Sequence, residues 1–197
     1  MSAITGTTRL ACLLGSPVSH SISPLIHNFS FQYLGIDCAY LAFDINEQNL
    51  KEAVEGLKAL HVLGFNLTMP NKNKILEYLD DLSDAARLIG AVNTVENREG
   101  RLIGHNTDGV GFMHSVREQH IQMEGQSMTL MGIGGAATAI CAQAALDGVK
   151  TIHVFARSTS SHLPRIQKLA ASLERETPCA IFLHDIRDLA ALKTTMR

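Results

Sequence analysis

One stretch, TLMGIGGAATAICAQAALDG at residues 129–148, restricts the fold of this chain more than any other. An apolar run leads into Gly132 and Gly134, and a segment rich in helix-forming alanine follows at once. Glycines permit a tight turn there and leave the backbone bare where the helix begins. The stretch therefore predicts a strand, a glycine turn and a helix, which together form the repeating unit of a parallel α/β sheet.

The rest of the chain shows the same alternation of short apolar runs with longer segments of helical period. The predicted strands span 9–14, 38–43, 61–66, 91–96, 101–105, 127–132, 151–156 and 179–183. The predicted helices span 24–34, 47–59, 71–79, 82–89, 107–120, 136–147, 163–176 and 186–194. Asn46 is a candidate N-cap for the helix at 47–59, and a turn at 98–100 indicates a hairpin.

The chain changes character near residues 106–109, so we expect two domains. Residues 1–108 would form an α/β substrate-binding domain, 109–122 a linking helix, and 123–197 a dinucleotide-binding Rossmann domain. A Rossmann domain has two mononucleotide-binding halves, and the predicted strands after residue 122 supply about one of them. The predicted fold class is therefore α/β, with an incomplete Rossmann domain.

Composition and charge exclude several classes of function. A formal net charge of −2 gives no basic surface for nucleic acid and no polybasic signal for a membrane. The apolar run at 10–14 is too short for a signal-peptide core or a membrane span. The four cysteines form no C-x-x-C pair, which indicates reduced, buried thiols in a cytoplasmic protein. The nine histidines form no H-E-x-x-H motif or tight cluster, so we expect no metal site.

The glycine turn has the spacing G-x-G-x-x-A at residues 132–137, which is typical of dinucleotide-binding sites. In such sites the pyrophosphate lies at the N-terminus of the helix. An acidic residue about 20 positions further on usually holds the ribose 2′-hydroxyl; here Arg157 stands at that distance. Arginine suits a 2′-phosphate, and the hydroxyl residues at 158–160 add donors, so NADP is favoured over NAD. The alternatives are a plain tight turn and a solvated loop arginine.

Polar segments stand at the ends of predicted strands or the starts of helices in the first part of the chain. They are Ser19–Pro24, Asn66–Lys72, Ala91–Thr94 and Asn106–Gly109. Ligands of α/β proteins bind at the carboxyl ends of the strands. Hydroxyls, amides, a lysine and a carboxylate together suit a small polyol acid. Structural alternatives are Ser23-Pro24 as a helix cap, Asn93 as a turn residue and Asp108 as a helix cap.

The sequences GSPVSHSISPLIHN, GFNLTMPNK, GAVNT, NTDGVGF and GIGGAATA occur in this order. With them the chain resembles, over nearly its whole length, the shikimate dehydrogenase family, including its quinate/shikimate branch. The resemblance implies NADP-linked interconversion of shikimate and 3-dehydroshikimate in chorismate and aromatic amino-acid biosynthesis. It leaves open the use of quinate, the use of NAD, and a homodimer.

The resemblance also implies a role for individual residues. Lys72 and Asp108 would be catalytic, with Lys72 as the acid/base. The substrate-binding residues would be Ser21 and Ser23 for the carboxylate and Thr68, Asn93 and Asp108 for the ring hydroxyls. The cofactor-binding residues would be Asp84, Gly132, Ile133, Gly134, Gly135, Ala136, Ala156, Arg157 and Ser158. A lysine that holds the substrate hydroxyl can also relay its proton, as oxidation of a secondary alcohol requires.

Two features depart from the family pattern. Ala156 stands where the adenosine loop usually begins with asparagine, and no second arginine follows within 158–163, which leaves dual use of NADP and NAD open. The family's later segments, which hold the nicotinamide, have no counterpart in the 197 residues. A non-catalytic ligand-binding protein and a different reductase on the same fold are therefore alternatives.

Overall fold

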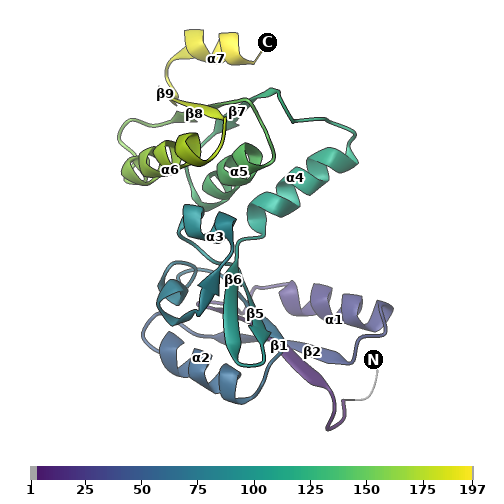
Figure 1. Ribbon diagram of the computed structural model, residues 1–197. Coiled ribbons are helices and arrows are strands. Elements are labelled where there is room, and N and C mark those ends of the chain that lie inside the picture. The colour runs from purple at the N-terminus through teal and green to yellow at the C-terminus, as the bar shows by residue number, and fades with distance from the viewer. Residues whose placement is uncertain (1–3, 197) are drawn as a thin grey trace. The chain divides into compact units, whose positions relative to one another are not determined.

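The computed structural model describes residues 4–196 and divides the chain into two units, one ending at His105 and the other beginning at Asn106. The first unit contains β1 (Arg9–Gly15), α1 (Ser23–Tyr33), β2 (Cys38–Asp44), α2 (Leu50–Ala59), β3 (Gly64–Leu67), the 3-10 helix η1 (Lys74–Tyr78), β4 (Asp81–Leu82), α3 (Asp84–Ile89), β5 (Thr94–Arg98) and β6 (Arg101–His105). The second contains α4 (Asp108–Glu118), β7 (Ser127–Met131), α5 (Gly135–Leu146), β8 (Thr151–Ala156), α6 (Leu163–Glu176), β9 (Ala180–Asp185) and α7 (Leu189–Thr195) (Figure 1). The predicted α/β class is confirmed.

The first unit is built on a mixed, 6-stranded sheet with the strand order β2-β1-β3-β5-β6-β4. β1 runs parallel to β2 and β3, whereas β5 is antiparallel to both β3 and β6. The chain turns between β5 and β6 at Glu99 and Gly100, whose φ angles are 52° and 90°. Two positive φ angles suit a two-residue hairpin turn. The predicted hairpin is confirmed.

β1 buries side chains on both faces of this sheet. Cys12 and Leu14 belong to one core cluster, which also contains the buried residues of α2. Ala11 and Leu13 belong to a second cluster with Tyr40 of β2. Alternate residues of a strand point to opposite faces, so a strand covered on both sides reads as an unbroken apolar run.

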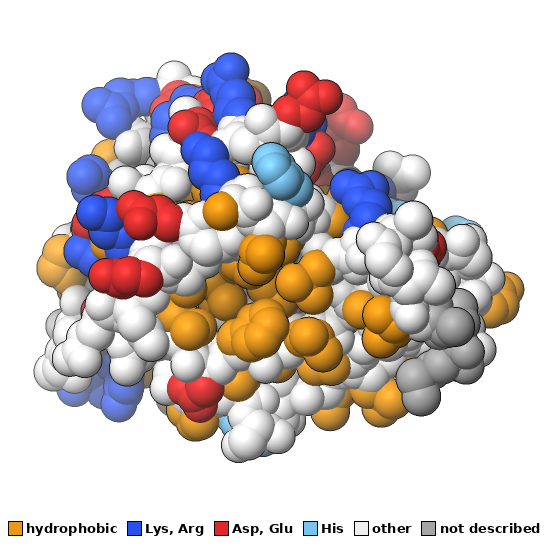
Figure 2. All heavy atoms as spheres, turned by 90° about the horizontal axis from the view of Figure 1, so that it is seen from below, with side chains coloured by type: hydrophobic (Ala, Val, Ile, Leu, Met, Phe, Trp, Pro, Cys, Tyr) orange, Lys and Arg blue, Asp and Glu red, His pale blue; other side chains and the backbone are white. Residues whose placement is uncertain are grey.

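Helix α1 leaves much of its apolar surface uncovered. None of its residues is buried, and Leu25, Phe29 and Tyr33 are exposed. β2, at the edge of the sheet, adds exposed Leu41 and Phe43. Figure 2 shows hydrophobic side chains gathered on the face seen from below.

The second unit contains a 3-stranded parallel sheet with the order β7-β8-β9. Met131, Phe155 and His184 are register partners across the three strands. Helices α5 and α6 pack against the sheet, and α7 lies against β7, where Thr129 Oγ1 donates a hydrogen bond to Thr195 O (3.0 Å). Because the strands are parallel, their carboxyl ends lie at one edge of this sheet.

Helix α4 meets α5 at a glycine. Gly109 is buried, and a Cβ atom added to it would collide with the backbone carbonyl oxygen of Ala139. The two helices therefore approach each other at this point without an intervening side chain.

Several predicted boundaries are wrong for local reasons. β3 begins at Gly64 rather than 61, because His61 adopts a φ of 51° in the turn after α2. β5 begins at Thr94, and the helix predicted at 71–79 is the shorter η1. Strand β4 was not predicted, since two residues carry no periodic pattern.

The predicted capping role of Asn46 is also wrong. Helix α2 begins at Leu50, and Asn49 occupies the N-cap position without a side-chain bond to the helix. Asn46 Oδ1 accepts a hydrogen bond from Gln48 N (2.9 Å), while Asn49 Oδ1 accepts one from Asn46 N (3.0 Å). The two amides thus stabilise the turn that precedes the helix.

Candidate functional site

The polar segments that follow β1 and β3 are joined at the carboxyl ends of these strands. Thr68 N donates to Leu14 O (3.0 Å), and Ser16 N donates to Met69 O (3.0 Å). The Ser16–Pro17 and Met69–Pro70 peptide bonds are both cis. The segment containing Ser21 and the segment containing Lys72 therefore both leave from this one edge of the sheet.

Gly15, the last residue of β1, makes room for Thr68. A Cβ atom on Gly15 would overlap Thr68 Cγ2 and would lie 3.1 Å from Met69 O. Gly15 is buried and Thr68 is half-buried. The threonine side chain thus occupies space that any residue other than glycine would fill.

Asn93 reaches the same edge through the reversed direction of β5. Since β5 is antiparallel to β3, its first residue, Thr94, lies opposite Asn66 near the end of β3. Leu67 N donates to Asn93 O (2.9 Å), and the Asn93 side chain is buried. The structure therefore brings Asn93 next to the strand end that carries Thr68.

A series of side-chain hydrogen bonds connects Tyr40 to the side chain of Asn93. Tyr40 Oη donates to Asn66 Oδ1 (2.7 Å), and Asn66 Nδ2 donates to Thr94 Oγ1 (3.0 Å). Thr94 Oγ1 in turn donates to Asn93 Oδ1 (3.0 Å). Burial raises the pKa of Tyr40, so its phenol stays a proton donor. Tyr40 and Thr94 were missed as site residues; the polar position of Asn66 in an apolar strand was the available signal.

Hydrogen bonds of the Lys72 main chain and of the preceding residue, Asn71, fix the position of the segment that carries Lys72. Lys72 O accepts a hydrogen bond from Val92 N (2.8 Å), which links the segment to the one that carries Asn93. Asn71 is fully buried, and its Nδ2 donates to Ile45 O (2.7 Å). The half-buried Lys72 side chain is therefore placed by a fixed main chain.

Ser21 precedes α1, and Ser23 is the first residue of this helix. The N-cap position belongs to Ile22, whose side chain makes no capping hydrogen bond. Ser21 Oγ accepts a hydrogen bond from Ser23 N (3.2 Å). The capping alternative for Ser23 is thus wrong, while the expected proline in the first turn is confirmed by Pro24.

Asp108 lies in the second unit, as the first residue of α4. Thr107 occupies the N-cap position, so the capping alternative for Asp108 is wrong. Asp108 N donates to the side chain of buried Asn106 (Oδ1, 3.2 Å). A carboxylate in the first turn of a helix interacts favourably with the helix dipole.

Asp84 opens helix α3 in the first unit, directly after the N-cap Ser83. Its side chain is exposed and forms an ion pair with Arg87 one turn later.

The glycine turn of the second unit has the predicted shape. Gly132 adopts a φ of +104°, which other residues rarely adopt, and its N–H donates to Phe155 O (2.8 Å). Helix α5 begins at Gly135, and its N-cap, Gly134, has no side chain to cap the helix. Cβ atoms added to Gly134 or Gly135 would meet nothing within 4 Å. The surface above the first turn is therefore open.

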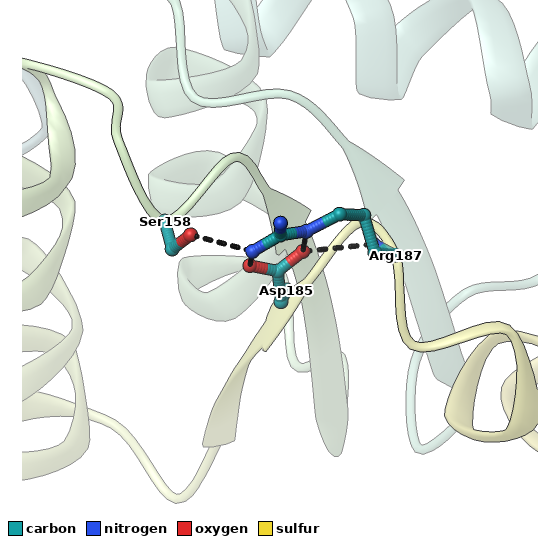
Figure 3. Close-up of polar contacts among 3 residues, drawn as sticks. All are labelled: Ser158, Asp185 and Arg187. Carbon is teal, nitrogen blue, oxygen red and sulfur yellow. Dashed lines mark hydrogen bonds and ion pairs between the residues drawn. The ribbon is translucent and has the colours of Figure 1, made fainter.

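The loop after β8 carries exposed Arg157 and Ser158, while Ala156 is buried at the end of the strand. Two residues from the end of β9 join this loop, as Figure 3 shows. Arg187 binds Asp185 and donates to Ser158 Oγ (Nη2, 3.1 Å). The sequence did not indicate Asp185 and Arg187, because they lie 28 and 30 positions after Arg157 in the chain. Only the pairing of β9 with β8 brings them next to this loop.

Three further properties concern the described residues. All four cysteines are free, and burial raises the pKa of Cys12 and Cys141 to about 12. Within residues 4–196, no group of three or more His, Cys, Asp and Glu side chains is placed to hold a metal ion. Over the same range, no helix has the length and apolarity needed to cross a membrane.

These features define a class of protein: an α/β chain with a polar site at the strand ends of one unit and a glycine turn before a helix in the other. Residues 13–95 match the family described as the shikimate dehydrogenase substrate binding domain. An NADP(+) shikimate dehydrogenase of Listeria monocytogenes is 47% identical over 190 residues. That alignment covers 96% of this chain and 65% of the relative, so the chain spans about two thirds of the relative's length.

Solved structures agree with this match. A shikimate 5-dehydrogenase from Listeria monocytogenes, in complex with shikimate and NAD, is 45% identical with a TM-score of 0.96. The match covers 100% of this chain and 68% of that one. A 5-ketofructose reductase of a Gluconobacter strain is 33% identical with a TM-score of 0.85, covering 92% of this chain and 64% of its own. The chain belongs to the shikimate dehydrogenase family.

Proposed function

We propose that the protein containing this chain interconverts shikimate and 3-dehydroshikimate, with NADP as the hydride carrier, in chorismate and aromatic amino-acid biosynthesis. The observation that carries the proposal is the meeting of Thr68 and Asn93 at one strand end, through Leu67 N and Asn93 O. Hydroxyl and amide groups placed together suit a polyhydroxylated ring. The family membership and the NADP-linked relative support the same reaction.

The proposal assigns binding and proton transfer to different residues. Ser21 and Ser23 would donate hydrogen bonds to the substrate carboxylate, and Thr68 and Asn93 would bind ring hydroxyls. Lys72 would hold the reacting hydroxyl and accept its proton on oxidation, returning it on reduction. Asp108 would bind a ring hydroxyl and assist the proton transfer.

The second unit would be the first half of a Rossmann domain and would hold the adenosine end of NADP, or of NAD. The open surface above Gly134 and Gly135 and the uncapped start of α5 fit a pyrophosphate. Ile133 and Ala136 complete this turn, Ala156 to Ser158 would surround the ribose, and Asp84 would lie near the cofactor. The nicotinamide, when bound, supplies the hydride-accepting carbon.

Several expectations about the whole protein stay predictions. The division at residues 108 and 122 is supported by the contrast between the two sheets. The four free cysteines support a cytoplasmic location. The exposed apolar residues of α1 and β2 support a homodimer.

The direct test is to add shikimate and NADP to the purified protein and to follow the absorbance of the reduced cofactor. Quinate, and NAD in place of NADP, are measured in parallel, and 5-ketofructose with NADPH tests the reductase alternative. Calorimetry measures shikimate binding independently of turnover. Shikimate binding without reduction of NADP would indicate a non-catalytic ligand-binding protein. If the protein neither binds shikimate nor reduces NADP, the proposal is overturned.

A further inference from the structure

The Asp185 side chain lies next to the loop that follows β8. Asp185 is the register partner of Ala156, the last residue of β8, and Arg157 and Ser158 follow directly. In a nucleotide-binding α/β unit, the adenosine ribose lies over the end of this second strand. Charged groups at the end of β9 therefore act on whatever the ribose carries at its 2′ position.

Arg187 binds Asp185 through two parallel hydrogen bonds. Nε donates to Oδ1 (3.0 Å) and Nη2 to Oδ2 (2.9 Å), and the backbone N–H of Arg187 also donates to Oδ1 (2.9 Å). The same Nη2 donates to Ser158 Oγ (3.1 Å), so the guanidinium spans the loops after β8 and β9 (Figure 3). The Arg187 guanidinium holds the pKa of Asp185 far below its usual range, and the carboxylate stays charged.

Stability does not account for this arrangement. The Arg187 side chain is 81% exposed, and exposed ion pairs contribute little to the free energy of folding. Among residues 4–196, none accepts a hydrogen bond from Arg187 Nη1. Its two N–H groups can therefore bind an anion without breaking the pair with Asp185.

The charges at this edge have opposite preferences for the two cofactors. A 2′-phosphate needs cations, whereas a carboxylate repels it and accepts a hydrogen bond from a 2′-hydroxyl. Arg157 and Arg187 contribute two positive charges and Asp185 one negative charge. As long as Arg187 neutralises Asp185, the site keeps a net positive charge that favours the phosphate.

We propose that the Asp185–Arg187 pair sets the preference between NADP and NAD. Arg187 acts with Arg157 on the 2′-phosphate and cancels the repulsion from Asp185. The inference rests on the proposed dinucleotide site. To that site it adds the guanidinium of Arg187, from the end of a different strand than Arg157, and the carboxylate of Asp185, which repels a 2′-phosphate.

Two variants should change the preference in opposite directions. Arg187→Ala leaves Asp185 uncompensated, so binding of 2′-phospho-ADP-ribose should weaken about tenfold or more, while ADP-ribose binding stays nearly constant. Asp185→Asn removes the repulsion, so 2′-phospho-ADP-ribose should bind several-fold more tightly. Both probes lack nicotinamide and need only the adenosine end of the site.

The experiment is calorimetric titration of the 197-residue chain with each probe at low salt, where exposed charges are least screened. Arg175→Ala is the matched control, because Arg175 is exposed near the C-terminal end of α6 and donates to Ser172 Oγ (3.1 Å). Thermal melting shows that each variant is folded. If both probes bind but each variant alters them equally, the inference is overturned and the dinucleotide site stands. If neither probe binds the unaltered chain, the proposed dinucleotide site fails and the inference with it.

Discussion

Tyr40 and Asn66 are joined by a hydrogen bond of 2.7 Å from the phenol to the side-chain oxygen, across strands that are not neighbours in the sheet. The ring of His27 stacks on Tyr40, with ring centroids 4.2 Å apart and planes inclined by 11°. The bond fixes which way the Asn66 amide faces, because its oxygen must meet the phenol. Its nitrogen then donates toward Thr94, and Thr94 orients Asn93.

Tyr40→Phe should therefore weaken both the fold and the site. The half-buried side-chain oxygen of Asn66 loses its donor, which costs about 1 kcal/mol of unfolding free energy. Shikimate binding should weaken a few-fold because Asn93 loses its orientation. Urea unfolding and calorimetry measure the two effects. Tyr33→Phe is the control, since Tyr33 is 81% exposed, and equal effects in both variants would contradict the network's role.

Gly15→Ala should weaken substrate binding although the substitution replaces none of the proposed substrate-binding residues. The new methyl group would displace Thr68, so we expect shikimate binding to weaken about tenfold or more, the size of one lost charged or well-placed hydrogen bond. Gly56→Ala makes the same chemical change inside α2, where a Cβ atom meets nothing within 4 Å. That control should be stabilised by about 0.5–1 kcal/mol instead. Unchanged binding in Gly15→Ala would rule out the displacement.

Lys72→Ala should reduce turnover far more than affinity. General acid–base catalysis contributes about a hundredfold or more to the rate, so kcat should fall by at least that factor. The dissociation constant of shikimate should change much less. Lys74→Ala is the control, because Lys74 is paired with Glu77 (2.7 Å). A loss of affinity with kcat intact would make Lys72 a binding residue only.

Ser21→Ala and Ser23→Ala should each raise the dissociation constant of shikimate about tenfold, as loss of a hydrogen bond to a carboxylate does. Ser30→Ala is a control within α1, since Ser30 Oγ donates to Ile26 O (2.9 Å) and Ser30 is not a predicted site residue. Calorimetry measures all three. Wild-type affinity in both Ser21 and Ser23 variants would remove the carboxylate assignment.

Acid should destabilise the second unit through His153. Its Nδ1 lies 3.1 Å from Nε2 of His184, and burial, together with His184, lowers the pKa of His153. The unfolded chain then binds the proton more readily, so stability is full above the ordinary histidine pKa of about 6.5 and falls as the pH drops below it. His153→Phe should reduce the loss of unfolding free energy between pH 7.5 and 5.5. An unchanged loss would assign it to other groups.

The sequence was sufficient for most of the fold because periodic patterns report burial. Helix α6, at 163–176, was predicted to the residue, since its apolar side chains recur on one buried face. The turn residues at 98–100 also correctly predicted the β5–β6 hairpin. Boundaries failed where a single backbone angle decided them, as at His61.

The candidate site was predictable only as far as its residues stand in short polar segments. Thr68 and Asn93 could be named, but their meeting depends on the antiparallel pairing of β5 with β3, which no local pattern encodes. Tyr40 and Arg187 were not predicted as site residues for the same reason. Each acts on a residue more than 20 positions away, at distances that only the folded chain sets.

The contact of Gly109 with the carbonyl of Ala139 has a consequence for how the chain opens. Because the two helices are in direct contact at this glycine, we expect the amide protons of α4 and α5 to exchange with solvent as one cooperative group. Asp108, at the start of α4, would then be released together with α5 and not independently of it. The carboxylate is therefore carried by one of two helices that are packed directly against each other.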